Sequence, residues 1–211
     1  MKNPSRISTD EIRAVFFMKK RAIVVILLLL SAFFLFSAVV QTKQEQRALS
    51  AKLIRLHVIA ASDSEEDQAR KLRVRDAVLA EIGKTEWSSR EEAESSLRAL
   101  LPKLGSAARQ ALQESGAEQT VAVTLSPERY PTRFYPTFTL PAGEYLSLRV
   151  VLGAGEGRNW WCVVYPSLCN AAQSELPAKA AAAGLTGREV KLITADTIGV
   201  KLKWKLLEWL N

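Results

Sequence analysis

The sequence predicts an α+β domain, an antiparallel sheet with helices packed on one face, preceded by an N-terminal membrane or signal helix. Three observations favour this fold. Apolar residues alternate with a period of two in several short segments, which is typical of strands. Apolar residues recur at helical spacing between residues 64 and 115. A stretch of 19 residues without a charge, an amide or a proline precedes both patterns.

The uncharged stretch spans residues 22–40, and as a helix of about 28 Å it is long enough to cross a bilayer. The basic residues 19–21 (KKR) precede it directly, so the positive-inside rule places residues 1–21 in the cytoplasm and exports the remainder. A buried core helix is the alternative, but it would be shorter and would show periodic polar positions. The sequence SAVV at residues 37–40 matches a cleavage site poorly, which favours an uncleaved anchor over a cleaved signal peptide.

The net charge of +7 is concentrated beside this stretch. Six of the 29 basic residues and two of the 22 acidic residues lie in residues 1–21, which leaves 23 and 20 for the rest. The excess therefore orients a membrane helix, and no nucleic-acid partner is expected. Met18 begins the compact basic segment MKKRAIVV and is an alternative translation start to Met1.

The exported part begins with a polar linker, residues 41–52, followed by one domain over residues 53–211. Alternation predicts a first strand over Leu53–Ala60, on which Arg55 and His57 share a face. A helix is expected over residues 64–82, because two serines stand three residues before acidic residues, the spacing of a capping box.

Later segments continue the α+β pattern. Two further helices are expected, over residues 88–102, where Pro102 ends the first, and over residues 103–115. Strands are expected over residues 119–125, 144–152, 159–165 and 197–210. Residues 153–157 (GAGEG) predict a turn that joins two strands into a hairpin; a phosphate loop would need GxGxxG before a helix. Residues 171–187 fit either a short helix or a surface loop.

Cys162 and Cys169 are the two cysteines of the chain, and the predicted topology places both outside the cytoplasm. A disulfide between them is the most economical interpretation in that compartment. Two buried free thiols remain an alternative, as does a catalytic thiol paired with His57.

Catalytic and metal-binding patterns are not evident. The sequence contains no GxSxG, HExxH, SxxK or Walker motif, and the single histidine, His57, cannot form a zinc site alone. Helix capping explains the acidic residues 63–67 more economically than a cation site does, so no metal or cofactor is expected. Trp160 and Trp161 must face opposite sides of a strand; one is expected in the core and the other at a partner-binding surface.

Two segments carry a resemblance to a known family. They read IRLHVIAASDSEEDQARKLRVRDAVL at residues 54–79 and LPAGEYLSLRVVLGAGEGRNWWCVVYPSLC at residues 140–169. Together they resemble the stage II sporulation protein R family of endospore-forming Firmicutes, over most of residues 53–210. The family's usual asparagine after RLHVIA is Ala61 here, so any capping role passes to Ser62 or Ser64.

The resemblance implies a sporulation signalling protein rather than an enzyme. Such a protein is exported from the forespore into the space between forespore and mother cell. There it activates a membrane-embedded aspartic protease, the stage II sporulation protein GA, which processes pro-sigma E into active sigma E. Residues of the distinctive motifs are the partner-binding candidates: His57, Asp63, Asp67, Arg75, Asp76, Glu144, Tyr145, Asn159, Trp160 and Trp161. A cell-wall hydrolase with paired carboxylates and a structural envelope protein are the alternatives.

Overall fold

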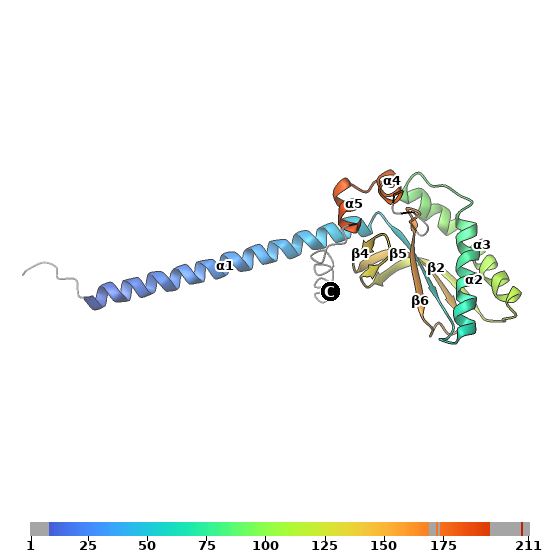
Figure 1. Cartoon of the computed structure of the whole chain (residues 1–211), viewed down its shortest axis with the longest axis horizontal. Helices are drawn as coiled ribbons and strands as arrows, with labels where there is room; N and C mark the ends of the chain where they lie inside the picture. The colour runs from blue at the N-terminus through green and yellow to red at the C-terminus, as the bar shows by residue number, and fades with distance from the viewer. Residues whose placement is uncertain (1–8, 169–171, 173, 195–207, 209–211) are drawn as a thin grey trace, which may run out of the picture. The chain divides into compact units, whose positions relative to one another are not determined.

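The computed structural model describes residues 9–168, 172, 174–194 and 208 (Figure 1). The chain divides into two compact units, residues 1–44 and 45–211. Helix α1 (Thr9–Ser50) forms the first unit and continues through the predicted linker into the first residues of the second. Among the described residues, one helical stretch, residues 16–50, is long and apolar enough to cross a membrane. It contains the predicted residues 22–40 and is compatible with a signal sequence or an anchor.

The second unit is built around a four-stranded sheet of order β2-β5-β1-β6. The strands are β1 (Ile54–Ile59), β2 (Val121–Tyr130), β5 (Gly143–Leu152) and β6 (Asn159–Tyr165). The pairs β2–β5 and β1–β6 are antiparallel, whereas β1–β5 is parallel. The α+β class and the mostly antiparallel sheet are therefore confirmed. One pair is parallel because two helices and β2 intervene between β1 and β5 and return the chain to the end where β1 began.

The predicted hairpin of the last two described strands is wrong, because β1 lies between β5 and β6. The glycine turn instead crosses the end of β1, where the Gly157 amide donates to the Ala60 carbonyl at 2.9 Å. A Cβ at Gly157 would lie 2.1 Å from the Ser62 carbonyl oxygen, so only glycine allows this close crossing. Gly153 and Gly155 adopt positive φ values of 52° and 69°, which other residues rarely tolerate.

Helices α2 (Glu65–Ile82) and α3 (Arg90–Glu114) cover one face of this sheet. The predicted start of α2 is confirmed, since the Ser64 hydroxyl accepts a hydrogen bond from the Asp67 amide. The two helices expected over residues 88–115 are one helix, which continues through Pro102. Pro102 removes one backbone donor, but buried Leu97 and Leu104 on either side hold α3 against the core.

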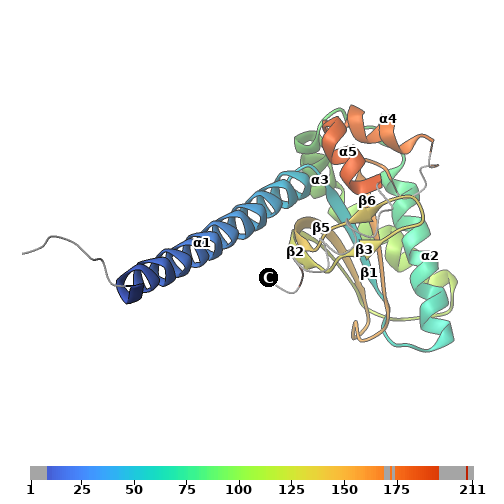
Figure 2. The ribbon, with the colours of Figure 1, turned by 60° about the vertical axis from the view of Figure 1, so that its left-hand side comes forward.

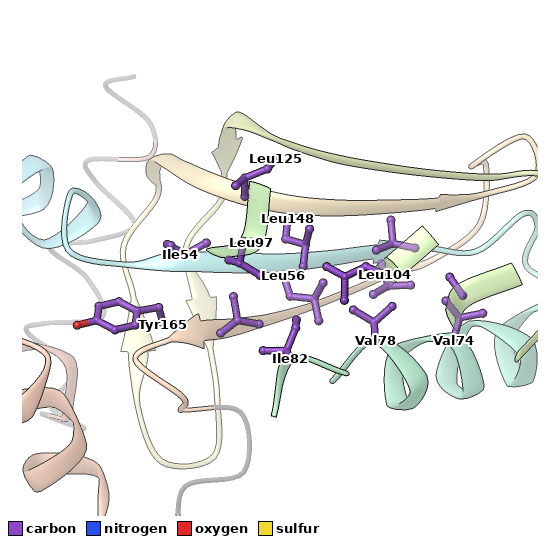
Figure 3. Close-up of a cluster of buried hydrophobic side chains, with 14 of the residues drawn as sticks. Ile54, Leu56, Val74, Val78, Ile82, Leu97, Leu104, Leu125, Leu148 and Tyr165 are labelled. Atoms are coloured by element: carbon purple, nitrogen blue, oxygen red, sulfur yellow. The ribbon is translucent and has the colours of Figure 1, made fainter. Parts of the chain in front are cut away.

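The main core fills the space between these helices and the sheet. Figure 3 shows the side chains of Ile54 and Leu56 on β1 facing Val78 on α2 and Leu97 on α3. Leu56, Val78 and Leu97 are completely buried. The alternation of β1 and β5 supplies the apolar residues on this face, which leaves the intervening positions for the opposite face.

A second cluster lies against the opposite face. It includes the ribbon of β3 (Arg133–Phe134) and β4 (Thr139–Leu140), together with α4 (Leu176–Ala182) and α5 (Gly187–Thr194). Figure 2 shows α4 and α5 close together near one end of β6. The expectation of helices on one face therefore holds for α2 and α3 but not for these two short helices. The helical alternative for residues 171–187 is confirmed over α4.

Strand β2 is longer than the predicted strand over residues 119–125. It continues through Pro127 to Tyr130. A proline is tolerated because β2 has one strand neighbour in the described sheet, so its other edge needs no ladder donor. The strand predicted over residues 197–210 lies outside the described residues, apart from Glu208.

Candidate functional site

The sequence-predicted candidates lie in separate regions of the second unit. His57, Tyr145, Asn159 and Trp161 lie on the sheet face away from α2 and α3, whereas Arg75, Asp76 and Trp160 lie on the α2 side. Asp63 lies in the turn before α2, Asp67 lies in the first turn of α2, and Glu144 lies at the exposed start of β5. We call the first region the polar face. It comprises the residues Arg55, His57, Glu128, Tyr130, Tyr145, Ser147, Arg149, Asn159 and Trp161, which share one side of the four strands.

His57 is central to the polar face and is almost completely buried. Its Nδ1 lies 2.8 Å from Glu128 Oε1 on β2, and its Nε2 lies 2.8 Å from Asn159 Oδ1 on β6. Both ring nitrogens thus face oxygen atoms. An imidazolium would donate both hydrogen bonds, whereas a neutral ring requires the Asn159 amide to turn and present its nitrogen. In either form His57 ties β1 to β2 and β6.

Glu128 connects His57 to the rest of the polar face. Its Oε2 accepts a hydrogen bond from the Ser147 hydroxyl at 2.6 Å, and its Oε1 lies 3.6 Å from Arg149 Nε. The Ser147 hydroxyl also lies 2.7 Å from that of Tyr130. Ser147 is completely buried and bonds the carboxylate rather than the imidazole. The described geometry therefore lacks the serine–histidine contact of a hydrolytic triad.

Arg55 is the largest completely buried side chain of the described residues. Its guanidinium carbon lies 3.8 Å from the ring centre of Tyr130 and 4.8 Å from that of Tyr145, and Nη2 donates to the Tyr135 hydroxyl at 2.8 Å. Burial raises the pKa of Tyr130 and of Tyr145, so both rings are neutral at physiological pH. Arg55 Nε and Nη1 have no hydrogen-bond partner among the described residues.

The ring of Trp161 contacts a second arginine, Arg133. The Arg133 guanidinium, from the β3–β4 ribbon, lies 3.2 Å from the Trp161 ring centre, and the His57 ring lies 5.3 Å from it on β1. Trp161 is half-buried. Burial lowers the pKa of Arg133, while Tyr135 and then Glu208 act in the opposite direction. Arg133 Nε is buried and has no hydrogen-bond partner among the described residues.

Trp160 faces α2, as the strand alternation predicts. It packs against the main core, and the Arg75 guanidinium lies 5.0 Å from its ring centre. Arg75 also donates to the neighbouring Asp76 at 2.8 Å. These three residues form a partly exposed cluster on the helical side of the domain, separated from the polar face by the sheet.

Asp63 and Asp67 organise the turn between β1 and α2. The Asp63 carboxylate accepts a hydrogen bond from the Arg158 backbone amide at 2.7 Å, which connects this turn to the glycine turn. Asp67 accepts hydrogen bonds from Ser62 at 2.6 Å, Gln119 at 2.6 Å and Arg70 at 3.0 Å. The bonds from Ser62 and Gln119 lower the pKa of Asp67. The distinctive SDS-DQ motif thus has a clear structural role.

Tyr145 and Glu144 occupy different environments despite being neighbours. Tyr145 is buried and donates its hydroxyl to the Pro141 carbonyl at 2.7 Å, so it supports Arg55 from within the domain. Glu144 is exposed at the start of β5.

Cys162 lies on β6, where it is buried and disulfide-bonded. Cys169 lies outside the described residues, so the pairing of the two cysteines stays a prediction.

Sequence reasoning missed several members of the polar face, and it also missed Arg133, which contacts this face from β3. The missed members are Glu128, Tyr130, Ser147 and Arg149. Alternation of the strand predicted over residues 144–152 would have placed Ser147 and Arg149 on one face. Glu128 and Tyr130 were hidden because Pro127 lies inside their strand. No local pattern predicts that Arg133 crosses from a separate ribbon to Trp161.

Comparison with known proteins identifies the family. The sequence pattern of the family described as Stage II sporulation protein R (spore_II_R) matches residues 50–175, which include the whole four-stranded sheet. The Stage II sporulation protein R of Bacillus subtilis (strain 168) is 34% identical over 180 residues, covering 75% of this chain and 80% of that protein. No solved structure matches the chain. The chain belongs to the stage II sporulation protein R family.

Proposed function

We propose that this chain is an exported intercellular signal of endospore formation. It is made in the forespore and reaches the intermembrane space through its N-terminal helix. There it activates the membrane-embedded aspartic protease, stage II sporulation protein GA, which converts pro-sigma E into sigma E.

The observation that carries this proposal is the family match over the second unit, directly behind an apolar helix. The match begins at residue 50, where α1 ends, and the apolar stretch at residues 22–40 follows three basic residues. All side chains in that stretch except Val39 are exposed, and Phe36 is 70% exposed, as suits a segment that contacts lipid. This order of an export segment and then a folded domain is what a delivered signal requires.

The polar face also favours binding over catalysis. A glycoside hydrolase of the cell wall needs two carboxyl groups roughly 5 to 9.5 Å apart, one as acid and one as base or nucleophile. Among the described residues, the strands contribute one carboxylate to the polar face, that of Glu128. Its two oxygens already contact His57 and Ser147. The face offers arginines and aromatic rings instead, which are common at protein interfaces.

A binder activates a protease only if it binds the active arrangement more tightly than the inactive one. A difference of about 1.4 kcal/mol shifts the equilibrium tenfold, so a moderate interface is sufficient. The exported domain would thus act by biasing the conformation or assembly of the protease through its extracytoplasmic surface.

The test is reconstitution of the full chain, the protease and pro-sigma E in lipid vesicles. The full chain is expected to increase pro-sigma E cleavage at least about tenfold, and a substitution in the protease's own catalytic aspartates should abolish it. Cleavage at the same rate with and without the chain would overturn the proposal.

Two further measurements separate the alternatives. A cell-wall hydrolase would release soluble fragments from purified peptidoglycan, whereas the signalling proposal predicts none. Deletion of the chain should leave a sigma-E-dependent reporter silent in sporulating cells, and an active reporter would favour a structural envelope protein.

A further inference from the structure

We infer that the polar face receives an acidic segment of the partner protein, with carboxylates paired to Arg133 and Arg149 on either side of Trp161. This inference rests on the proposed function for the identity of the partner, but the chemistry of the binding surface rests on the structure.

The arrangement of the two arginines follows from the strand register. His57 pairs with Arg149 on one neighbouring strand and with Trp161 on the other. Arg133 reaches Trp161 from the ribbon and stacks on its ring. Arg149, His57, Trp161 and Arg133 therefore form a row across the sheet, with a guanidinium at each end and an aromatic residue between them.

The charge of this row is unbalanced. The polar face and Arg133 together carry three guanidinium groups, at Arg55, Arg133 and Arg149, against one carboxylate on the four strands, at Glu128. Glu208 acts on Arg133 through its charge but forms no ion pair with it among the described residues. Glu128 already accepts a hydrogen bond from Ser147, interacts with His57 and lies only 3.6 Å from Arg149 Nε. The side chain of Arg149 is 45% exposed, so its remaining donors are accessible to a partner.

Partly buried arginines elsewhere in the domain have carboxylate partners, which Arg55 and Arg133 lack among the described residues. Arg70, Arg75 and Arg90 are partly buried on α2 and α3, and each forms an ion pair with a carboxylate. Arg55 and Arg133 are buried or partly buried without any ion pair within the described residues. Guanidinium donors that are buried without a hydrogen-bond partner destabilise the folded domain, because they lose their hydration without a replacement.

Arg133 is the accessible member of this unpaired set. Its pKa responds to Glu208, so this guanidinium already lies within the electrostatic range of a carboxylate. Arg55 lies deeper and cannot touch a docked segment, but its charge adds to the positive potential of the face. Trp161 beside Arg133 supplies the apolar contact; tryptophan and arginine are the residues most enriched at interface hot spots.

The inference is tested with the full chain in lipid nanodiscs, using three single variants. Arg133→Glu reverses the charge beside Trp161, and Arg149→Gln removes the charge at the other end of the row. Arg129→Glu is the matched control, since Arg129 is exposed on β2 next to Glu128 but on the opposite side by alternation. Thermal unfolding of each variant verifies that the domain folds.

The probe for carboxylate binding is fluorescein-labelled poly-L-glutamate of about 20 residues. Arg133→Glu is expected to weaken its binding at least about tenfold and Arg149→Gln about threefold, while Arg129→Glu stays within twofold of the wild type. Raising the salt concentration should weaken wild-type binding. Equal binding by all four proteins would overturn the inference.

Reconstituted pro-sigma E processing then identifies the partner. The inference predicts that Arg133→Glu loses stimulation and that an Asp→Lys or Glu→Lys change in an extracytoplasmic segment of the protease restores it. If the wild type stimulates processing and folded Arg133→Glu stimulates it equally, the inference fails and the proposed function survives. If the wild type binds poly-L-glutamate through Arg133 but does not stimulate processing, the proposed function fails instead. If Arg133 is required for binding purified peptidoglycan but not poly-L-glutamate, the partner is the wall and the inference is wrong.

Discussion

Replacing Arg55 by methionine tests whether the polar face contains a buried charge that has no carboxylate partner. Arg55 is completely buried, stacks on two tyrosines and donates one hydrogen bond, to Tyr135. Methionine is of similar length and flexible, so it can fill most of the space between the rings without a charge.

The expected change in stability follows from opposing contributions. The substitution loses one hydrogen bond, about 1 kcal/mol. It also loses two cation–π contacts, about 1 to 2 kcal/mol each for desolvated groups. In return it removes two unpartnered guanidinium donors, at about 1 to 3 kcal/mol each, and the burial of an unpaired charge. We therefore expect Arg55→Met to change the free energy of unfolding by less than about 1 kcal/mol, or to raise it.

The assay is urea unfolding of the full chain in nanodiscs, monitored by tryptophan fluorescence. Arg55→Lys is the matched control, because it keeps a buried charge on a more strongly hydrated group and loses the planar stacking; it should cost at least about 2 kcal/mol. A loss of about 3 kcal/mol or more for Arg55→Met would mean that the guanidinium is fully satisfied in the folded protein, which would refute the reasoning.

Three further predictions concern the frame around the polar face. Leu148→Ala should lower the free energy of unfolding by about 2 to 5 kcal/mol in the same urea assay, because Leu148 is completely buried in the main core; a loss below 1 kcal/mol would contradict this packing. Gly157→Ala should cost at least about 2 kcal/mol, since its Cβ would meet the Ser62 carbonyl, whereas Gly187→Ala, with open space around it, should be neutral. Asp67→Asn should destabilise the domain at neutral pH. Hydrogen bonds lower the pKa of the Asp67 carboxyl, so the advantage of aspartate should be constant above about pH 5 and shrink as the pH falls below about 3.9; a difference that is the same at pH 7 and pH 3 would argue against a stabilised carboxylate.

Local patterns predict well those elements whose apolar periodicity or capping residues lie within a few neighbouring residues. The first strand, the α2 start at Ser64 and the opposite orientations of Trp160 and Trp161 all follow from spacing within a few residues. These features depend on backbone periodicity and on one hydrogen bond, which neighbouring residues determine.

The structure differs from the sequence-based predictions where contacts between distant segments determine the strand order or the length of an element. A glycine turn between two strands normally gives a hairpin, but β1 (Ile54–Ile59), which lies far earlier in the chain than β6 (Asn159–Tyr165), inserts between β5 and β6. Pro102 and Pro127 interrupt neither α3 nor β2, because burial of Leu97 and Leu104 outweighs one lost donor and because β2 lies at an edge. No single segment of the sequence contains the information that sets these contacts.

The polar face shows the same dependence on distant segments, and this bears on its function. His57 receives its partners from residues 71 and 102 positions away, and Arg133 reaches Trp161 from a ribbon outside the main sheet. A sheet face needed only for stability would be filled more cheaply by apolar side chains, as the face toward α2 and α3 is. Two arginines without carboxylate partners, stacked on aromatic rings beside a half-buried tryptophan, oppose the stability of the isolated domain. A partner that supplies acidic groups would relieve that cost on binding. It would shift the partner toward one conformation only if that conformation presents the acidic groups better than the other does.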